Sequence, residues 1–121
     1  MKKNILIVDD CTTTRKIISI YLRLDGYNII GAVDGIDALE KLTTSDVDLI
    51  ITDLNMPQMD GIELVKSVKS NPVYSKIPII MLTTEAGEIS RTKGKEVGVS
   101  TYLTKPVPKD VLRKEVIKLM G

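Results

Sequence analysis

The chain has 121 residues, 43% of them hydrophobic and 27% charged, as is typical of one soluble globular domain with a real core. Its 17 Lys and Arg nearly balance its 16 Asp and Glu, so net charge gives no reason to expect binding to nucleic acid or to an anionic membrane. It contains no His and one Cys, which excludes His-based metal sites, a Ser-His-Asp triad, a phosphohistidine carrier and an internal disulfide.

The N-terminus runs directly into a short apolar segment that ends in two acids. This segment is too short for a signal peptide or a membrane span. The single Cys11 agrees with a reducing compartment, so we expect a cytoplasmic protein. We also expect residues 1–121 to form one domain, with no output domain after the last helix.

Five short apolar runs predict the strands of a sheet. They comprise residues 4–8, 27–33, 47–52, 78–83 and 101–104. The first, third and fourth contain continuous, mostly β-branched stretches, which are typical of strands covered by helices on both faces. The second and fifth include polar residues, as is common in strands at the edge of a sheet.

Amphipathic segments between these runs predict helices. The residues expected to face the core are, helix by helix, Ile17, Ile20, Tyr21 and Leu24; Ala38, Leu39 and Leu42; Ile62, Val65 and Val68; and Leu112, Val116 and Leu119.

Sequence signals also mark the ends of these helices. Gly26 is expected to stop the first helix and Asp34 to cap the second. Asn71-Pro72 is expected to end the third, and Pro108 lies near the start of the last.

A helix over residues 86–97 is predicted to dock weakly on the sheet. It has few apolar residues and two glycines, Gly87 and Gly94. Each interior glycine costs about 0.8–1 kcal/mol relative to Ala. Five strands alternating with five helices predict an α/β fold, a doubly wound parallel sheet with helices on both faces. In such a sheet the functional site lies beyond the carboxyl ends of the strands.

Polar residues follow four of the predicted strands at their carboxyl ends. They are Asp9 and Asp10 after the first strand, Asp53 and Asn55 after the third, Thr83 and Glu85 at the end of the fourth, and Lys105 after the fifth. Taken singly, each has an ordinary explanation as a solvated or capping residue. Together, three carboxylates on one rim repel one another unless a cation neutralises them. Mg²⁺ prefers oxygen ligands, and the lack of His and of paired Cys argues against zinc.

Four motifs stand at these strand ends in order: ILIVDD, DLNMPQMDGIEL, IIMLTTE and TYLTKP. Through them the sequence resembles, over its whole length, the receiver domain of two-component response regulators, and most of all the stand-alone chemotaxis regulators of that family. The resemblance implies a flavodoxin-like strand order 2-1-3-4-5. It also implies a phosphorylation switch that catalyses its own phosphorylation and dephosphorylation, rather than an enzyme in the ordinary sense.

The resemblance makes Asp53 the phosphorylated residue. It implies that Asp10, Asp53 and the backbone carbonyl of Asn55 ligate Mg²⁺, for which Mn²⁺ can substitute, with Asp9 acting largely through a bound water. Asn55 and Glu85 flank the acceptor as in the chemotaxis regulators, which implies comparatively fast dephosphorylation.

The resemblance also assigns the residues that respond to phosphorylation. Thr83 and Lys105 would contact the phosphoryl oxygens, and Tyr102 would turn inward in the active state. The Lys105-Pro106 bond is often cis in this family.

Because the chain has no His, the phosphoryl donor is expected to be a histidine kinase or phosphotransfer protein, or a small phosphodonor. The expected output surface is formed by the fourth helix, fifth strand and fifth helix. An equally weighted alternative is that this basic face is simply solvated and binds no partner. Its residues are Lys93, Lys95, Tyr102, Lys109, Arg113 and Lys114. The expected target is a flagellar motor switch component or the next member of a phosphorelay, and the state a monomer or a phosphorylation-dependent dimer.

Two other classes remain open from the sequence. A metal-dependent phosphohydrolase with an aspartyl-phosphate intermediate carries an Asp-x-Asp pair after its first strand, whereas here Asp53 follows the third and Asn55 replaces a second acid. A flavodoxin-like FMN carrier needs a phosphate-cradling loop after the first strand, where this chain has two acids. Cys11 follows those acids, and we expect an ordinary buried or partly buried cysteine there.

Overall fold

The computed structural model describes residues 2–84 and 95–120, in which strands and helices alternate. The elements in chain order are β1 (Asn4–Val8), α1 (Thr12–Arg23), β2 (Asn28–Ala32), α2 (Gly35–Thr44), β3 (Leu49–Thr52), α3 (Gly61–Ser70), β4 (Ile79–Thr83), β5 (Thr101–Thr104) and α5 (Lys109–Met120). Of the helix predicted over residues 86–97, residues 95–97 are helical. The rest of that prediction lies outside the described residues.

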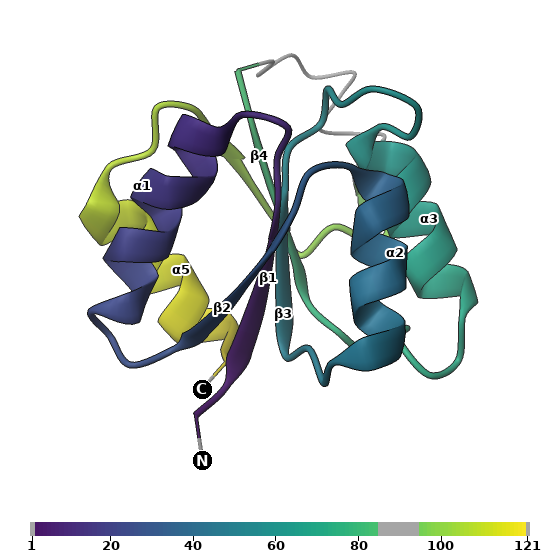
Figure 1. The fold of residues 1–121 in the computed structure, drawn as a ribbon, viewed down its shortest axis with the longest axis horizontal. Helices are drawn as coiled ribbons and strands as arrows, with labels where there is room; N and C mark the ends of the chain where they lie inside the picture. Colours follow the sequence, from purple (N-terminus) through teal and green to yellow (C-terminus); the bar gives the residue numbers. More distant parts are fainter. Residues whose placement is uncertain (1, 85–94, 121) are drawn as a thin grey trace.

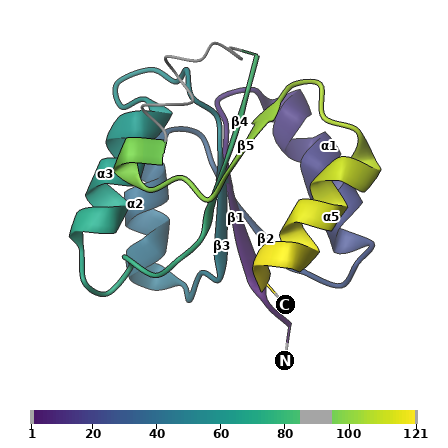
Figure 2. The ribbon, with the colours of Figure 1, turned by 180° about the vertical axis from the view of Figure 1, so that it is seen from behind.

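The five strands form one parallel sheet in the order β2-β1-β3-β4-β5, which confirms the predicted fold class. Helices α1 and α5 cover one face of the sheet, and α2 and α3 cover the other (Figure 1). The view from behind shows the same two layers around the sheet (Figure 2). Every strand therefore ends at the same rim, above which its following loop begins.

The alternation of side chains along the strands divides the core into two clusters. On the α1 and α5 face, Ile5 and Ile7 of β1 pack with Leu112 of α5. On the α2 and α3 face, Leu6 and Val8 pack with Val65 of α3. All residues of β3 and β4 are buried, as the continuous apolar runs predicted.

The predicted apolar face of α1 is wrong by one position. Ile18 and Leu22 are buried, whereas Ile17, Ile20 and Leu24 are 44%, 58% and 71% exposed. Tyr21 is half-buried against the cluster on this face. Apolar residues occupy almost every position from 17 to 24, so two helical faces fit the pattern. Ile18 and Leu22 lie one turn apart, and packing against the sheet selects that pair.

In the other helices the predicted core faces are confirmed. Ala38 and Leu42, the three residues predicted in α3, and Leu112 and Val116 are buried. Leu39 and Leu119 are half-buried beside them. The sequence analysis missed Leu64 and Met120, which are also buried.

The helix ends follow the predicted signals. Asp34 caps α2 by accepting from the N–H of Asp37 at 2.8 Å. Gly26, after α1, adopts a φ of 90°, a left-handed conformation that favours glycine. Helix α3 ends at Ser70 and is followed by Asn71 as its C-cap. At its start, Asp60 and Glu63 form a reciprocal capping box.

The longest helices of residues 2–84 and 95–120 have 12 residues. In that part of the chain no helix has the length and apolarity required to cross a bilayer.

Candidate functional site

The carboxyl ends of β1 and β3 bring three carboxylates together. Each of Asp9, Asp10 and Asp53 offers one oxygen, and these oxygens lie within 4.8 Å of one another. β1 and β3 are neighbours in register, with Val8 opposite Thr52, so the residues that follow them meet above the sheet. Asp10 is exposed, while Asp9 is buried.

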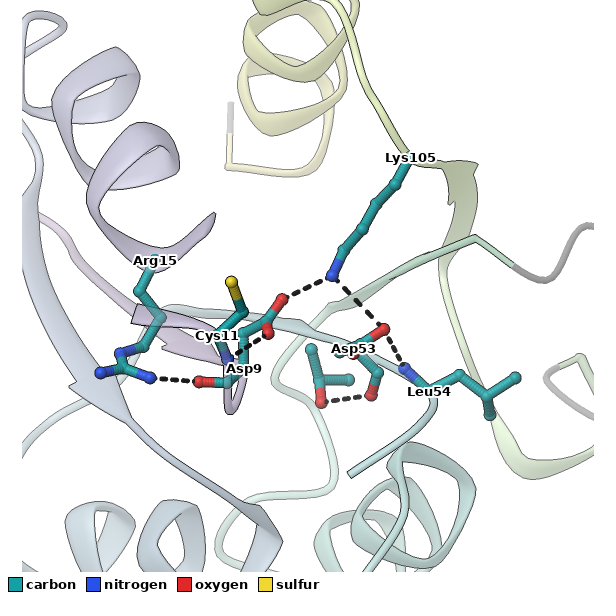
Figure 3. A network of polar contacts seen from close by, with 7 residues as sticks. Asp9, Cys11, Arg15, Asp53, Leu54 and Lys105 are labelled. Atoms are coloured by element: carbon teal, nitrogen blue, oxygen red, sulfur yellow. Dashed lines mark hydrogen bonds and ion pairs between the residues drawn. The ribbon is translucent and has the colours of Figure 1, made fainter. Parts of the chain in front are cut away.

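Asp9 is held at each of its oxygens (Figure 3). The N–H of Cys11 donates to Oδ1 at 2.9 Å, and Lys105 Nζ donates to Oδ2 at 2.6 Å. The guanidinium of Arg15 donates to the backbone carbonyl of Asp9. A carboxylate that is 3% exposed is tolerable in the fold because it is hydrogen-bonded and paired with an ammonium.

Asp53 is less buried than Asp9 and is held on one side. The N–H of Leu54 donates to its Oδ1 at 2.9 Å, and Lys105 Nζ lies 3.5 Å from the same oxygen. Burial raises the pKa of the Asp53 carboxyl above its ordinary value; the Lys105 charge opposes this shift and the Asp9 charge adds to it. Asp53 therefore presents a partly desolvated carboxylate oxygen to the rim.

Lys105 reaches the acids because β4 and β5 end side by side. Its backbone N–H donates to the carbonyl of Thr83 at 2.8 Å, and Thr83 is fully buried at the end of β4. The Lys105–Pro106 peptide bond is cis, as the resemblance implies. Thr83 and Lys105 thus border the carboxylates from the β4 and β5 side of the site.

The loop between β3 and α3 completes this rim. Asn55, two residues after Asp53, is exposed there. Gly61 begins α3, and its N–H donates to the carbonyl of Leu54 at 2.8 Å. A Cβ added to Gly61 would stand 2.3 Å from the carbonyl oxygen of Asp53. The start of α3 can approach the acceptor this closely only because residue 61 has no side chain.

The residues predicted for the output surface differ in their exposure and in their contacts. Tyr102 is half-buried and packs against the core cluster on the α3 side of the sheet. Lys95, Lys109 and Lys114 are exposed. Arg113 instead makes two hydrogen bonds of 2.7 and 2.8 Å to the carboxylate of Asp25, beyond the end of α1.

Arg113 is therefore committed to a contact within the molecule. Glu85 and Lys93, which the sequence analysis also singled out, lie outside the described residues.

Cys11 is exposed, so the expectation of a buried or partly buried cysteine is wrong. It is the N-cap residue of α1 and its side chain makes no capping hydrogen bond. The turn that places its N–H on Asp9 leaves the thiol at the surface.

Sequence reasoning assigned no role to Arg15 and Gly61, which both contact the backbone that carries the acids. Gly61 follows Asp60 within the second motif, DLNMPQMDGIEL, and a glycine at a helix start is a signal of close approach. Arg15 carries no such signal, because a helical arginine is ordinarily solvated.

The geometry fits a hard divalent cation. Among residues 2–84 and 95–120, three carboxylates converge with the Lys105 ammonium facing them, and Mg²⁺ binds through one or two carboxylates while keeping several waters. The donor set of the described residues at this rim contains oxygen and no His. The cluster could therefore hold Mg²⁺ and orient a phosphoryl group beside Asp53.

Comparison with known proteins agrees with this arrangement. Residues 5–117 match the response regulator receiver domain family. The chain is 40% identical over 119 residues to the chemotaxis protein CheY1 of Helicobacter pylori, which covers 97% of this chain and 96% of that protein. It is 41% identical over 118 residues to the sensor protein EvgS of Escherichia coli, covering 98% of this chain and 10% of EvgS.

The structural comparison gives the same result. A solved structure of the chemotaxis protein CheY4 of Vibrio cholerae has a TM-score of 0.94 and 38% sequence identity, covering 98% of this chain and 99% of CheY4. The chain belongs to the response regulator receiver domain family.

Proposed function

We propose that this chain is a single-domain receiver, residues 1–121, which accepts a phosphoryl group on Asp53 in a Mg²⁺-dependent reaction. The observation that carries the proposal is the convergence of three carboxylates with the Lys105 ammonium at the carboxyl ends of the strands. As a receiver it acts as a signalling switch and not as an enzyme with a product to release.

The proposed donor is a phosphohistidine on a histidine kinase or phosphotransfer protein, since this chain contains no His. An Asp53 carboxylate oxygen attacks phosphorus, and the bond between phosphorus and the imidazole nitrogen breaks. The electron pair of that bond returns to the imidazole. The product on this chain is an acyl phosphate.

Asp10, Asp53 and the backbone carbonyl of Asn55 would hold Mg²⁺, or Mn²⁺ in its place. Asp9 would act on the metal largely through a bound water. When bound, the cation offsets the negative charge of the phosphoryl oxygens. Lys105 Nζ, 3.5 Å from Asp53 Oδ1, contributes a second positive charge at the acceptor. Catalysis here is positioning and electrostatics.

The acyl phosphate adds about −1.5 to −2 charge and three strong acceptors at this rim. Thr83 is proposed to donate to one of the phosphoryl oxygens, and Tyr102 to move further inward in response. Both lie at the β4 and β5 end of the sheet, where Met81 and Tyr102 are opposite each other in register. Asn55 and Glu85 are proposed to set a short phosphoryl lifetime.

We propose that output is a protein contact on the side of Lys95, Tyr102, Lys109 and Lys114, with Arg113 left out because of its ion pair. The near full-length likeness to CheY1 supports chemotaxis in the cytoplasm, with a flagellar motor switch component as target. The likeness to a segment of the sensor EvgS supports a place in a phosphorelay as the second candidate.

The test is to incubate the purified protein with acetyl phosphate and MgCl₂ and to measure its intact mass. We expect wild type to gain one phosphate, and Asp53→Asn and EDTA-treated wild type to gain none. Asp46→Asn, which alters an exposed aspartate before β3, is the matched control and should label normally. Labelling of Asp53→Asn at the wild-type rate would reject Asp53 as the acceptor, and turnover of many equivalents would indicate a phosphohydrolase.

A further inference from the structure

The free edge of β2 borders a basic groove that the proposed function does not use. β2 ends the sheet and is the strand nearest the viewer in Figure 1, with α1 beside it. The groove has a volume of about 400 Å³. Six residues of α1 and two of β2 line it: Thr12, Arg15, Lys16, Ser19, Ile20, Arg23, Ile29 and Gly31.

The groove is built on one face of α1. Its helical residues recur at spacings of three and four positions, the spacing that places side chains on a common face. Three of them, Arg15, Lys16 and Arg23, are cationic, and α1 contains no Asp or Glu. Ile20 is 58% exposed and supplies an apolar surface between these cations.

The β2 residues in the groove direct their backbone groups away from the sheet. Along a strand, the direction of the N–H and C=O groups alternates. Asn28 donates to the carbonyl of Lys3, and Ala32 accepts from Asp9, so both face β1. Ile29 and Gly31 therefore face outward, and in residues 2–84 and 95–120 no strand pairs with that side of β2.

Arg15 is already positioned in this groove. Its guanidinium donates to the carbonyl of Asp9 and to Thr12 Oγ1 at 3.3 Å. Its Cδ and Nε lie 3.9 Å from where a Cβ on Gly31 would stand. A guanidinium has five N–H donors, so these two hydrogen bonds fix its place and leave donors for a further anion.

We propose that this groove binds an extended acidic segment of a partner protein, which adds to the sheet as a strand beside β2. Ile29 and Gly31 would supply two N–H donors and two C=O acceptors to the added backbone, as in β-strand addition. The α1 cations would select a segment with carboxylates on the face that meets the helix. An extended acidic segment would use both the outward backbone groups of β2 and the cations of α1. A small anion without a peptide backbone would use only the cations.

The spacing of the cations defines the segment further. Arg15 and Arg23 are eight residues apart, a rise of about 12 Å along a helix. In a strand, residues four apart lie on one face and are separated by about 13 Å. Acidic residues at positions i and i+4 therefore match Arg15 and Arg23, and an apolar residue at i+2 would meet Ile20 and Ile29.

This inference does not depend on phosphorylation of Asp53, and it is tested on the unphosphorylated protein. The probe is a fluorescein-labelled nine-residue peptide with Glu at its third and seventh positions, Val at its fifth and Thr elsewhere, titrated by fluorescence anisotropy. A rearranged peptide has the same composition but places its two Glu at adjacent positions, and so on opposite faces of a strand. We expect the rearranged peptide to bind about tenfold more weakly or worse, because only one carboxylate then meets α1.

Two pairs of variants separate the contributions of backbone and charge. Gly31→Pro removes the outward N–H at a position where an edge strand tolerates proline, whereas Gly31→Ala keeps that N–H and adds a Cβ with ordinary contacts. We expect Gly31→Pro to weaken binding by about tenfold and Gly31→Ala to leave it nearly unchanged. The double variant Lys16→Glu with Arg23→Glu should abolish binding. The control Lys66→Glu with Lys76→Glu, which changes exposed charges in and after α3, should retain it.

Circular dichroism and Tm establish whether each variant is folded. If Gly31→Pro does not fold, an amide NMR titration of the wild type tests strand addition in its place. Strand addition predicts that the amide signals of Ile29 and Gly31 shift on peptide binding and become protected from exchange. Equal binding of the two peptides, or unshifted signals at Ile29 and Gly31, would overturn the proposal in favour of diffuse charge attraction. Tighter competition by a DNA oligonucleotide than by the acidic peptide would overturn it in favour of a nucleic-acid surface.

Discussion

The ammonium of Lys105 lies 2.6 Å from an oxygen of Asp9 and 3.5 Å from an oxygen of Asp53. It is thus nearer to the buried carboxylate than to the proposed acceptor. Lys105 and Asp9 are 17% and 4% exposed at their side chains, so little water screens the pair. Lys105 occupies the same acidic rim that a divalent cation would neutralise, and the two positive charges must share it.

From this relationship we predict that Lys105→Met binds Mg²⁺ more tightly than wild type and accepts phosphate more slowly. Removal of the ammonium leaves the three carboxylates without their paired positive charge, which favours binding of the metal by about tenfold or more. The same removal leaves the phosphoryl oxygens less neutralised. Isothermal titration with MgCl₂ measures the first effect and acetyl phosphate labelling the second.

Lys109→Met is the matched control, because Lys109 is exposed at the start of α5. It should change neither Mg²⁺ affinity nor labelling. If Lys105→Met bound Mg²⁺ no more tightly than this control, the ammonium and the metal would not compete for the acids.

A second prediction concerns the stability of the metal-free protein against pH. The pKa of Asp53 is raised by burial in the folded state, relative to about 3.9 in an unfolded chain. Between these two pKa values the folded state binds more protons than the unfolded state, so the free energy of unfolding falls as pH rises. At pH 7 the charged carboxylate therefore costs stability.

We expect Asp53→Asn to have a higher Tm than wild type at pH 7 in EDTA. The difference should shrink as the pH falls toward the unfolded-state pKa of about 3.9, because both the folded and the unfolded wild type then bind the proton. Thermal unfolding followed by circular dichroism between pH 4 and pH 8 measures this. A Tm difference that stayed constant across that range would mean that the titration of Asp53 does not contribute.

Much of the site was predictable because it depends on topology. Parallel strands all end at one rim, so polar residues placed after separate apolar runs had to converge. The positions of Asp9 and Asp53 after their strands are sufficient to predict that their carboxylates lie close together. The same reasoning could not assign Lys105 to Asp9 rather than to Asp53, because that choice depends on side-chain rotamers above the sheet.

The apolar face of α1 shows where a sequence pattern is insufficient. Periodicity identifies a face only when polar residues occupy the others, and α1 has apolar residues on more than one side. Ile20 fitted the predicted core and is instead exposed in the groove beside β2. Similarly, Arg113 has an ordinary place among the basic residues of α5, and only the fold brings it to Asp25.

A third prediction tests the close approach of α3 to the acceptor. Gly61→Ala places a Cβ 2.3 Å from the carbonyl oxygen of Asp53 and 3.0 Å from Met81 Sδ, so the backbone must move. Overpacking of this kind typically costs about 1–3 kcal/mol. We expect a lower free energy of unfolding in urea and slower labelling of Asp53, since the carbonyl that would shift belongs to the acceptor residue.

Gly31→Ala is the control for Gly61→Ala, because its added Cβ has no contact closer than 3.9 Å. It should lose less than about 1 kcal/mol and label at the wild-type rate. Normal labelling by a destabilised Gly61→Ala would show that α3 supports the fold without positioning the acceptor.

The last prediction concerns the ion pair between Arg113 and Asp25, which joins α5 to the turn after α1. Asp25 accepts two hydrogen bonds from the guanidinium, and the side chains are 38% and 18% exposed. A half-exposed pair with this bidentate geometry should have a coupling free energy of about 0.5–1 kcal/mol. A double-mutant cycle of Arg113→Ala and Asp25→Ala, measured by urea unfolding, gives that coupling directly.

The cycle also tests whether Arg113 belongs to this contact or to an output surface. If the ion pair is its main role, Arg113→Ala and Asp25→Ala should be equally stable and should bind any downstream partner as wild type does. Lys109→Ala, one helical turn away and exposed, should leave stability unchanged. A coupling near zero together with lost partner binding in Arg113→Ala alone would return Arg113 to the output surface, because its charge would then act on the partner and not on Asp25.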